Sequence, residues 1–462
     1  MRRTSVSDSY FTSMNPANGQ MIASYGQDDA AAIERKLTGV CAAQPAWERQ
    51  GAAHRAASLL RLADALDANI ETLASSMVLE MGKPIQQARA EVKKCTALCR
   101  YTGEYGPAGL QAQHVDMDGR QALVRFDPLG CLLGIMPWNF PYWQALRLAV
   151  PTLLAGNAVL IKPAPNVHGS VAGLLNLFHL SGIPVIENLY ASETQTAAVI
   201  ADPRIAGVSL TGSRRAGRAV AAQAGRFLKK CVLELGGSDP YLVLADADVM
   251  LAARRCVTGR FNNTGQTCIA AKRWIVVDAV YDVFRSAALA LLAAFKTGDP
   301  MADDTDLGPM ARVDLRASLH RQVEQSIKAG ASCALGGFIP EGAGCYYPPT
   351  LLEGVKPGMP AFDDELFGPV AALIRAEDDE DAVRLANHSC LGLGAAVFST
   401  DQDKALSIAA RLQVGNVAIN DFVRSDPRLP FGGVKESGYG RELAIDGMRE
   451  FVNIKVVVAG VQ

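Results

Sequence analysis

The sequence contains few histidines and no closely spaced cysteine pairs, and these absences exclude two classes of metal site. The 462 residues include six histidines, none in an H-E-x-x-H or H-x-H pattern, so a zinc hydrolase is not expected. The ten cysteines are scattered without a C-x-x-C pair, which argues against a zinc ribbon or a disulfide framework. Cys95 and Cys99 are spaced as neighbours on a helix face and are interpreted as packing residues. We therefore expect no metal site.

Long apolar runs and an excess of one charge are also missing. The longest apolar runs, such as residues 146–154, are short and interrupted, far from the ~20 residues of a membrane span. The two arginines at the N-terminus are not followed by an apolar segment, so a signal peptide is not expected. The 45 basic and 47 acidic residues give a net charge of -2, which disfavours nucleic acid or an anionic membrane as the main partner. These absences predict a cytoplasmic protein.

Helical and strand-like segments divide the chain, whose length predicts two or three domains. Residues 28–108 are expected to be mostly helical, because apolar residues recur at spacings of three and four, with a break near Gly82. Residues 110–128 have the alternation of a hairpin around Asp118–Gly119, and a similar strand-like segment lies at 451–458. These two segments could pair with each other or extend the sheet of a neighbouring subunit. We favour an oligomerisation element in a homodimer or homotetramer.

Short apolar segments alternate with alanine-rich helical segments from residue 129 onward. This alternation is typical of a doubly wound parallel sheet, so we expect an α/β fold with a Rossmann-like domain and a second α/β domain. The expected strands within residues 129–245 are GCLLGIM, AVLIKP, LYAS, IAGVSLTGS, CVLELGG and YLVL. Those expected within residues 246–430 are WIVV, AALI, GAAVFS and VAIN.

Two single residues are candidates for covalent and base chemistry. Cys268 follows the polar turn F-N-N-T-G-Q-T and could be a nucleophile, because a pocket with amide donors lowers the pKa of a thiol. Taken alone, a cysteine after a polar turn is more often structural. Glu234 lies between two leucines in L-E-L-G-G, so its side chain faces away from theirs. In a cleft, burial would raise its pKa toward that of a general base, whereas at the solvent end of a sheet it would be an ordinary carboxylate.

Further motifs lie where a doubly wound sheet binds its ligand. The prolines of P-W-N-F-P fix the turn around Asn139, whose amide suits an oxyanion hole, although an asparagine in a turn is common. The segment T-G-S-R-R-A-G at 211–217 follows an apolar strand, and a glycine turn that opens a helix can bind a pyrophosphate. Lys162 lies at the end of the strand-like segment AVLI, at the carboxyl edge of the expected sheet.

In this order and at these spacings, the motifs resemble those of the aldehyde dehydrogenase superfamily. The series is P-W-N-F-P, I-K-P-A, T-G-S, L-E-L-G-G, G-Q-T-C, E-L-F-G-P at residues 365–369 and P-F-G-G-V-K at residues 430–435. The resemblance covers nearly the whole chain, beginning with N-P-A-N-G near Asn15. Within the superfamily the sequence looks closest to the short bacterial NAD(P)-dependent succinate semialdehyde dehydrogenases.

The resemblance implies roles in catalysis for three residues. Cys268 would attack the aldehyde, and Asn139 with the backbone N–H of Cys268 would form the oxyanion hole. Glu234 would activate the water that hydrolyses the thioester. The presence of Glu234 predicts hydrolysis, because relatives that pass the acyl group to coenzyme A tend to lack this base.

The resemblance also implies a binding site for NAD or NADP. Lys162 would hydrogen-bond the adenosine ribose, Gly212 and Ser213 would receive the pyrophosphate, and Glu365 would hold the nicotinamide ribose. NAD-selective relatives commonly carry an acidic residue where Pro165 stands here, so we expect both NAD and NADP to be used. The full set predicted for the cofactor is Pro137, Trp138, Lys162, Ala164, Pro165, Thr211, Gly212, Ser213, Gly236, Glu365 and Phe367.

The substrate prediction depends on fewer residues. In the semialdehyde dehydrogenases that this chain resembles, residues at the positions of Arg147 and Ser425 bind the distal carboxylate, and an arginine suits a carboxylate geometrically. A second arginine that some of these enzymes carry is replaced here by Asn262. The alternative is that Arg147 forms a salt bridge on a helix surface.

The resemblance suggests domain boundaries and leaves other functions open. Residues 7–108 and 128–235 would form the cofactor-binding domain, 236–430 the catalytic domain, and 109–127 with 444–462 the oligomerisation strands. The predicted reaction is oxidation of succinate semialdehyde or a related ω-semialdehyde. The alternatives are a dehydrogenase of broad aldehyde specificity, a non-catalytic relative, and a reductase that depends on phosphate or coenzyme A.

Overall fold

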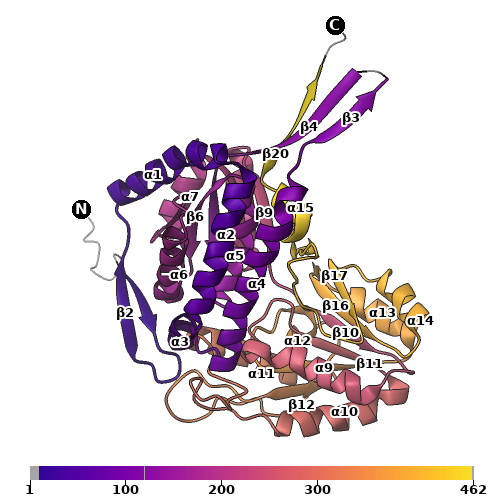
Figure 1. Ribbon diagram of the computed structural model, residues 1–462. Helices are drawn as coiled ribbons and strands as arrows, with labels where there is room; N and C mark the ends of the chain where they lie inside the picture. The colour runs from indigo at the N-terminus through magenta and orange to yellow at the C-terminus, as the bar shows by residue number, and fades with distance from the viewer. Residues whose placement is uncertain (1–9, 119, 460–462) are drawn as a thin grey trace.

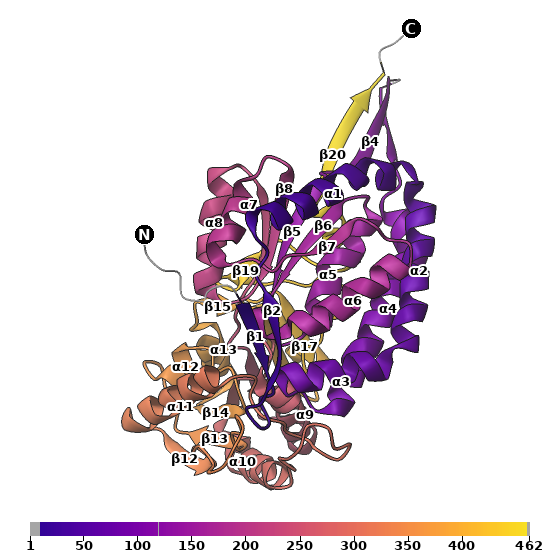
Figure 2. The same cartoon turned by 90° about the vertical axis from the view of Figure 1, so that its left-hand side faces the viewer.

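The computed structural model describes residues 10–118 and 120–459, in which two mainly parallel sheets form two lobes and a thin arm projects from the first (Figures 1 and 2). The α/β class expected from the strand and helix pattern is therefore confirmed. Residues 1–9 and 460–462, at the ends of the predicted domains, lie outside the described residues. Gly119 of the predicted turn does so as well.

The sheet of the first lobe has the strand order β19-β9-β8-β5-β6-β7. Helices connect β5 through β9, so these strands run parallel, and β19 joins the edge in the antiparallel direction. Parallel strands end at one edge, which brings Lys162, Thr211 and Glu234 to the same side of the sheet. The elements are β5 (Cys131–Met136), α5 (Pro141–Leu154), β6 (Ala158–Pro163), η2 (Pro165–Val167), α6 (His168–Leu180), β7 (Ile186–Asn188), α7 (Glu193–Ala201), β8 (Ile205–Thr211), α8 (Arg214–Arg226), β9 (Lys230–Glu234) and β19 (Gly438–Tyr439).

A helical block precedes this sheet, as predicted, and packs against it. Gly82 ends α3 with a left-handed φ of 77°, which residues with side chains rarely adopt, and α4 begins three residues later. Cys95 and Cys99 are fully buried on α4. Among the described residues, no helix is both long and apolar enough to cross a membrane. The amino-terminal elements are β1 (Tyr10–Met14), β2 (Met21–Gly26), α1 (Ala30–Arg49), α2 (Gly51–Ala68), α3 (Ile70–Met81) and α4 (Ile85–Gly109).

The second lobe has a sheet with the order β12-β13-β14-β11-β10-β16-β17. Two strand predictions were wrong. YLVL forms β10 (Pro240–Val243), which belongs to this sheet and not to the first, and LYAS follows β7 without forming a strand. The other elements here are α9 (Val249–Phe261), η3 (Asn262–Gly265), β11 (Arg273–Val277), α10 (Asp278–Ala293), α11 (Val313–Lys328), β12 (Ser332–Leu335), β13 (Thr350–Glu353), α12 (Pro360–Asp363), β14 (Val370–Ala376), α13 (Asp379–Asn387), β16 (Gly394–Phe398), α14 (Gln402–Ala409) and β17 (Asn416–Ile419).

The arm is a three-stranded antiparallel sheet with the order β20-β4-β3 (Figure 1). The hairpin predicted near residue 119 forms β3 (Gln113–Met117) and β4 (Arg120–Pro128), and β20 (Val452–Val458) pairs with β4 from Pro128 to Ala122. The two distant segments thus pair within one chain, which was one of the alternatives. Three short elements remain. The strand β15 (Leu391–Gly392) precedes β16 and pairs with β18 (Val434–Lys435), and α15 (Ala444–Arg449) precedes β20 in the chain.

Candidate active site

Cys268 follows a strained turn that both lobes help to fix. Asn263 and Thr264 have left-handed φ values of 55° and 53°, which a β-branched threonine rarely adopts. Gln87 of α4 accepts a hydrogen bond from the backbone N of Asn263 at 2.7 Å. The hydroxyl of Thr264 donates to the carbonyl of Gly308 at 3.2 Å. Such a turn persists only because its surroundings determine it, so the position of Cys268 is set by packing on several sides.

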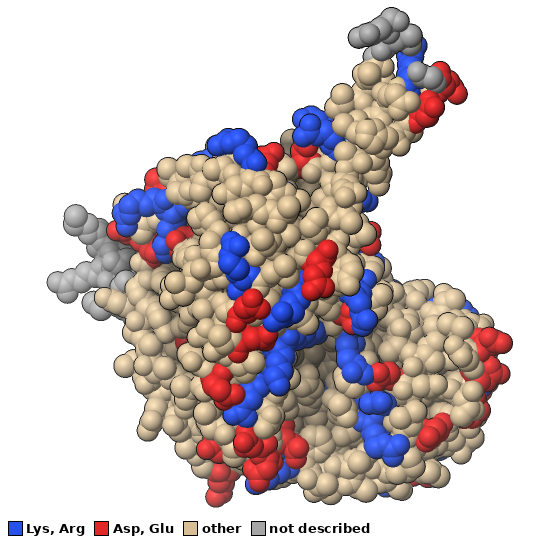
Figure 3. All heavy atoms as spheres, in the orientation of Figure 1, with Lys and Arg blue, Asp and Glu red and all other residues tan. Residues whose placement is uncertain are grey.

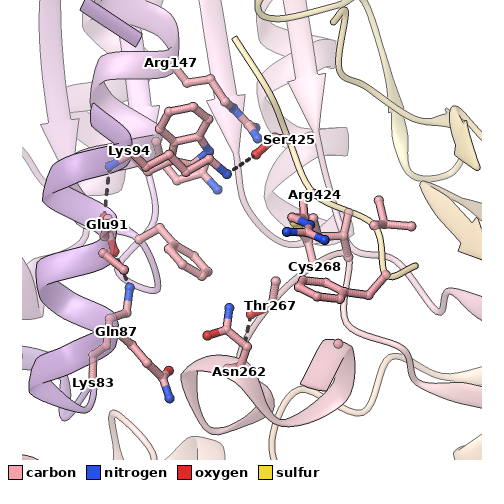
Figure 4. A pocket seen from close by; sticks show the side chains of 18 of the residues that line it. Lys83, Gln87, Glu91, Lys94, Arg147, Asn262, Thr267, Cys268, Arg424 and Ser425 are labelled. Carbon is pink, nitrogen blue, oxygen red and sulfur yellow. Dashed lines mark hydrogen bonds and ion pairs between the residues drawn. The ribbon is translucent and has the colours of Figure 1, made fainter. Parts of the chain in front are cut away.

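Cys268 lies in the walls of two cavities at once. The first, of about 400 Å³, is called here the α4–α5 cavity because side chains of these helices form much of its wall (Figure 4). The second, of about 250 Å³, is called the β8–α8 cavity because residues 211–213 between these elements line it. Gln144 of α5 also lines both. A group bound in one cavity can therefore meet a group bound in the other at the sulfur of Cys268.

The pKa of Cys268 differs from the expectation. The turn was expected to lower the pKa of a reactive thiol, but burial raises the pKa of Cys268 to about 12. The positive charges of Arg147 and Lys272 act in the opposite direction, while the carboxylates of Glu234 and Glu365 add to the increase. The side chain is therefore a thiol at neutral pH and must lose a proton before it can attack a carbonyl carbon.

Glu234 ends β9 in a buried position, facing away from the neighbouring leucines as the strand alternation predicts. Its side chain is 2% exposed, and Oε2 lies 3.6 Å from Nη2 of Arg147. Burial raises its pKa to about 8, and Arg147 opposes the increase. The alternative of a carboxylate at the solvent end of the sheet is therefore wrong. A carboxyl group with a pKa near neutrality has the property that a general base requires.

Arg147 is a buried residue of α5. It forms ion pairs with Glu234 and Glu442, and its guanidinium lies 4.6 Å from the centre of the Phe431 ring. The alternative of a salt bridge on a helix surface is therefore wrong, since Arg147 is only 2% exposed. Arg147 and Ser425 both line the α4–α5 cavity, so the structure brings the two predicted substrate residues together.

Asn139 lies in the β8–α8 cavity beside Cys268. Its amide nitrogen donates to the carbonyl of Gln266 at 3.0 Å, and its own backbone carbonyl accepts from the Asn263 amide at 2.8 Å. These bonds hold the side chain in place and leave the second hydrogen of the Asn139 amide available. Within the described part of the chain, the backbone N–H of Cys268 donates no hydrogen bond. Two donors are thus available near the sulfur.

Most residues predicted for the cofactor meet in the β8–α8 cavity. Ser213 begins α8, where its hydroxyl accepts from the backbone N of Ala216 at 3.3 Å, and the exposed amides of a helix start suit an anion. The buried hydroxyl of Thr211 has no hydrogen-bond partner among the described residues, and a Cβ atom at Gly212 would be near only Leu210, at 3.9 Å. These features fit a phosphate-containing cofactor. The predicted residues that line this cavity are Pro137, Trp138, Asn139, Thr211, Gly212, Ser213, Gly236, Glu365 and Phe367.

The aromatic and acidic residues of this cavity are closely packed. Trp138 and Phe367 meet edge to face with ring centres 5.7 Å apart. Glu365 accepts from the backbone N of Gly237 at 3.1 Å and lies 3.6 Å from Lys272. A Cβ atom at Gly236 would require the Glu365 carboxylate to move from its present position.

Lys162 lies in a third cavity of about 280 Å³, next to the start of α8. Burial lowers its pKa, and the nearby carboxylate of Glu193 opposes this effect. Glu193 and Arg215 line the same cavity, with apolar side chains opposite. Ala164 and Pro165, which were also predicted for the cofactor, line none of the three cavities described here.

The prediction from sequence missed several residues of this region. Lys94 and Gln144 line the cavities, Glu442 pairs with Arg147, and Lys272 donates to the carbonyl of Cys268 at 2.7 Å. A helical spacing of polar residues from Gln87 to Lys94 could have indicated one cavity wall. Glu442 carried no comparable signal, because its partner is far away in the chain.

Comparison with known proteins gives consistent matches over the whole chain. A family model described as the aldehyde dehydrogenase family matches residues 3–457. An NAD(P)+ succinate semialdehyde dehydrogenase, Sad, of Escherichia coli is 49% identical over 447 residues, which cover 96% of this chain and 97% of that protein. An NADP+ succinate-semialdehyde dehydrogenase of Deinococcus radiodurans is 44% identical, covering 97% and 94%. The crystal structure of the Streptococcus pyogenes succinic semialdehyde dehydrogenase with NADP+ superposes with a TM-score of 0.95 at 33% identity, covering 97% and 99%.

Proposed function

Because the chain belongs to the aldehyde dehydrogenase family, we propose that it oxidises succinate semialdehyde to succinate with NAD or NADP. The observation that carries the proposal is the position of Cys268 between two cavities of different chemistry. One cavity offers helix-start amides for phosphates, and the other contains Arg147 and Ser425 for a carboxylate. The similarity to succinate semialdehyde dehydrogenases of two bacteria supports the same substrate.

The proposed reaction begins at Cys268. Its thiol releases a proton to solvent through the open cavity, and the thiolate attacks the aldehyde carbon to form a thiohemiacetal. The Asn139 amide and the Cys268 backbone N–H donate to the oxyanion. The thiohemiacetal carbon then loses its hydrogen as hydride while the C=O double bond re-forms, and a bound nicotinamide cofactor would be the acceptor of that hydride. The product on Cys268 is a thioester.

Hydrolysis of the thioester is the proposed task of Glu234. Its carboxylate takes a proton from water, the water oxygen attacks the thioester carbon, and the Cys268 thiolate leaves with the bond electrons. Burial keeps Glu234 near its point of titration at physiological pH, which suits a group that must accept and then release a proton. Acyl transfer to coenzyme A is not part of the proposal.

We propose that both NAD and NADP are accepted. Pro165 places no carboxylate beside the predicted ribose site, and Lys162 and Arg215 offer two positive charges to a 2′-phosphate. Glu193 is the opposing charge in this cavity, so it would moderate the preference for NADP.

We also propose that the arm joins copies of this chain into a homodimer or homotetramer. Its strand β20 exposes Ile454 and Val456 at 60% each, and the strand β3, on the other side of β4, exposes Val115 and Met117. Apolar side chains on an unsupported thin sheet are unfavourable in water and favour contact with another surface. Light scattering should give a mass of two or four chains.

The function is tested by comparing succinate semialdehyde with butanal, which has the same carbon chain without the carboxylate. We expect kcat/KM to be at least about 30-fold higher for succinate semialdehyde, since a charge-assisted contact discriminates by roughly this factor. The product should be succinate whether or not coenzyme A or phosphate is added. Equal use of both aldehydes would overturn the proposed substrate, and an acyl-CoA product would overturn the proposed hydrolysis.

A further inference from the structure

The α4–α5 cavity is lined by four cationic side chains, and three of them already have carboxylate partners. Lys83 is ion-paired with Glu91, and Arg424 is ion-paired with Asp421. Arg147, described above, contacts two carboxylates. Figure 3 shows further Lys and Arg side chains around the hollow between the lobes on the face in view. The fourth cation of the lining is Lys94.

Arg147 contacts two carboxyl groups inside the protein. Arg147, Glu234 and Glu442 are each at most 4% exposed and lie in contact. A buried carboxylate that loses its cationic partner is strongly destabilised. If Arg147 turned fully to a substrate carboxylate, Glu234 and Glu442 would lose this contact. Arg147 is therefore already engaged by groups of the protein, and an anionic substrate would gain from a further cationic donor in this cavity.

Lys94 has a different environment. Within the described part of the chain it has no carboxylate within 4.0 Å, and its partners are a hydroxyl and an aromatic ring. Its Nζ donates to the hydroxyl oxygen of Ser425 at 2.7 Å and lies 4.1 Å from the centre of the Trp143 ring. Figure 4 shows this side chain reaching from α4 toward Ser425. The cavity thus contains a partly buried ammonium without an anionic partner.

We propose that Lys94 is a further donor to the distal carboxylate of the aldehyde substrate, which it binds together with Ser425 beside Arg147. The proposal rests on the function proposed above and names the group that recognises the substrate. Ser425 accepts from Lys94, so its own hydroxyl hydrogen remains to be donated. The pair therefore offers one charged and one neutral donor, which matches the two oxygens of a carboxylate.

The electrostatics of Lys94 agree with this role. Burial and, to a lesser degree, Arg147 lower the pKa of Lys94 to about 8, so the ammonium is protonated at neutral pH in an environment that disfavours its charge. The carboxylates of Glu91 and Asp426 oppose this decrease without contacting the ammonium, and a bound carboxylate would add a direct counter-charge. An aldehyde without a carboxylate gains nothing from this site.

The test replaces Lys94 by methionine, which keeps the length of the side chain and removes its charge. We expect KM for succinate semialdehyde to rise by about 10- to 100-fold, with kcat within about threefold, because the lost contact is a charge-assisted one far from the reacting bond. The value of kcat/KM for butanal should stay within about threefold. Lys94→Arg should restore most of the affinity for succinate semialdehyde, and Ser425→Ala should show a smaller increase in KM.

Lys93→Met is the matched control, because Lys93 is the exposed neighbour on the same helix and should leave both substrates unchanged. Thermal unfolding of each variant shows whether the fold is intact, and Lys94→Gln replaces Lys94→Met if the latter is unfolded. An unchanged preference for succinate semialdehyde in a folded Lys94 variant would overturn the role of Lys94 alone. An equal loss for both aldehydes would assign Lys94 to the structure of the cavity wall and overturn it as well. If the wild-type protein itself shows no preference, the proposed substrate fails, whatever the variants do.

Discussion

The two cavities that meet at Cys268 are built in different ways. The β8–α8 cavity is lined mainly by short contiguous segments at the carboxyl ends of strands, such as residues 137–139 and 211–213. The α4–α5 cavity is lined by side chains from two helices, the Cys268 turn and the loop at 422–431. In this second cavity the hydrogen-bonded pair Lys94 and Ser425 is separated by 331 residues in the chain.

The difference separates two kinds of recognition. The β8–α8 cavity offers backbone amides and hydroxyls, which several neighbouring positions supply together. The α4–α5 cavity offers buried charges, most of which cancel each other, so that single side chains decide which anion fits. We therefore expect single substitutions in the lining of the β8–α8 cavity to change cofactor affinity by small steps. Single substitutions of charged residues in the α4–α5 cavity, or of Cys268 where the two cavities meet, should have large effects on aldehyde binding or turnover.

The largest effect is expected at the junction of the two cavities. Cys268→Ala should reduce kcat by at least about 10⁴-fold, because no other group can form the covalent intermediate. Both cavities should remain intact, so NADPH binding measured by fluorescence should be nearly unchanged. Cys390→Ala, at an exposed cysteine, is the control and should retain full activity. Substantial turnover by the Cys268 variant would contradict the assignment of the nucleophile.

Glu234→Gln should have the next largest effect, and it acts only after hydride transfer. We expect steady-state turnover to fall by about 10²- to 10⁴-fold while a stopped-flow burst of NADH is preserved. In the wild-type protein, burial keeps Glu234 protonated at low pH, so the hydrolytic rate should rise as pH increases through about 8. The variant should lack this rise. Glu436→Gln, at a partly exposed surface carboxylate, is the control, and wild-type turnover in the Glu234 variant would contradict its role.

The third prediction concerns Asn139→Ala, at the proposed oxyanion donor in the wall of the β8–α8 cavity. Loss of one oxyanion donor should reduce kcat by about 10²- to 10³-fold with little change in cofactor affinity. Asn18→Ala is a suitable control, because Asn18 is exposed in the turn between β1 and β2 and lines none of the three cavities. Single-turnover kinetics should locate the defect before thioester formation. A defect confined to cofactor binding would instead give Asn139 a structural role.

The smallest effect is expected far from Cys268, at the Lys162 cavity. Arg215→Ala should lower the ratio of kcat/KM for NADP to that for NAD by about 3- to 10-fold, because an exposed charge contributes little to a phosphate contact. Glu193→Ala should shift the same ratio in the opposite direction. Neither change should alter KM for the aldehyde. A change in KM for the aldehyde would show that the cofactor site and the aldehyde site are not independent.

The pattern of residues predicted much of the fold and the cofactor side of the site. Alternation of short apolar and helical segments predicted the α/β class, and the family resemblance is confirmed by the match over residues 3–457. The strand YLVL was assigned to the wrong sheet because its local pattern is the same in either sheet. The roles of Cys268, Glu234 and Asn139 stay predictions, although the structure brings Cys268 and Asn139 to one cavity and buries Glu234 behind Arg147.

The sequence by itself determined the class of fold and the order of the motifs, because strand periodicity and glycine turns are local properties of the chain. Only the tertiary structure decided which charges neutralise each other. Arg147 was predicted to bind the substrate carboxylate or to form a salt bridge on a helix surface, and folding buries it with Glu442 and Glu234 beside it. Folding also placed Lys94 opposite the Cys268 turn without a carboxylate partner among the described residues. Electrostatic balance depends on distances between residues remote in sequence, and only the packed structure sets those distances.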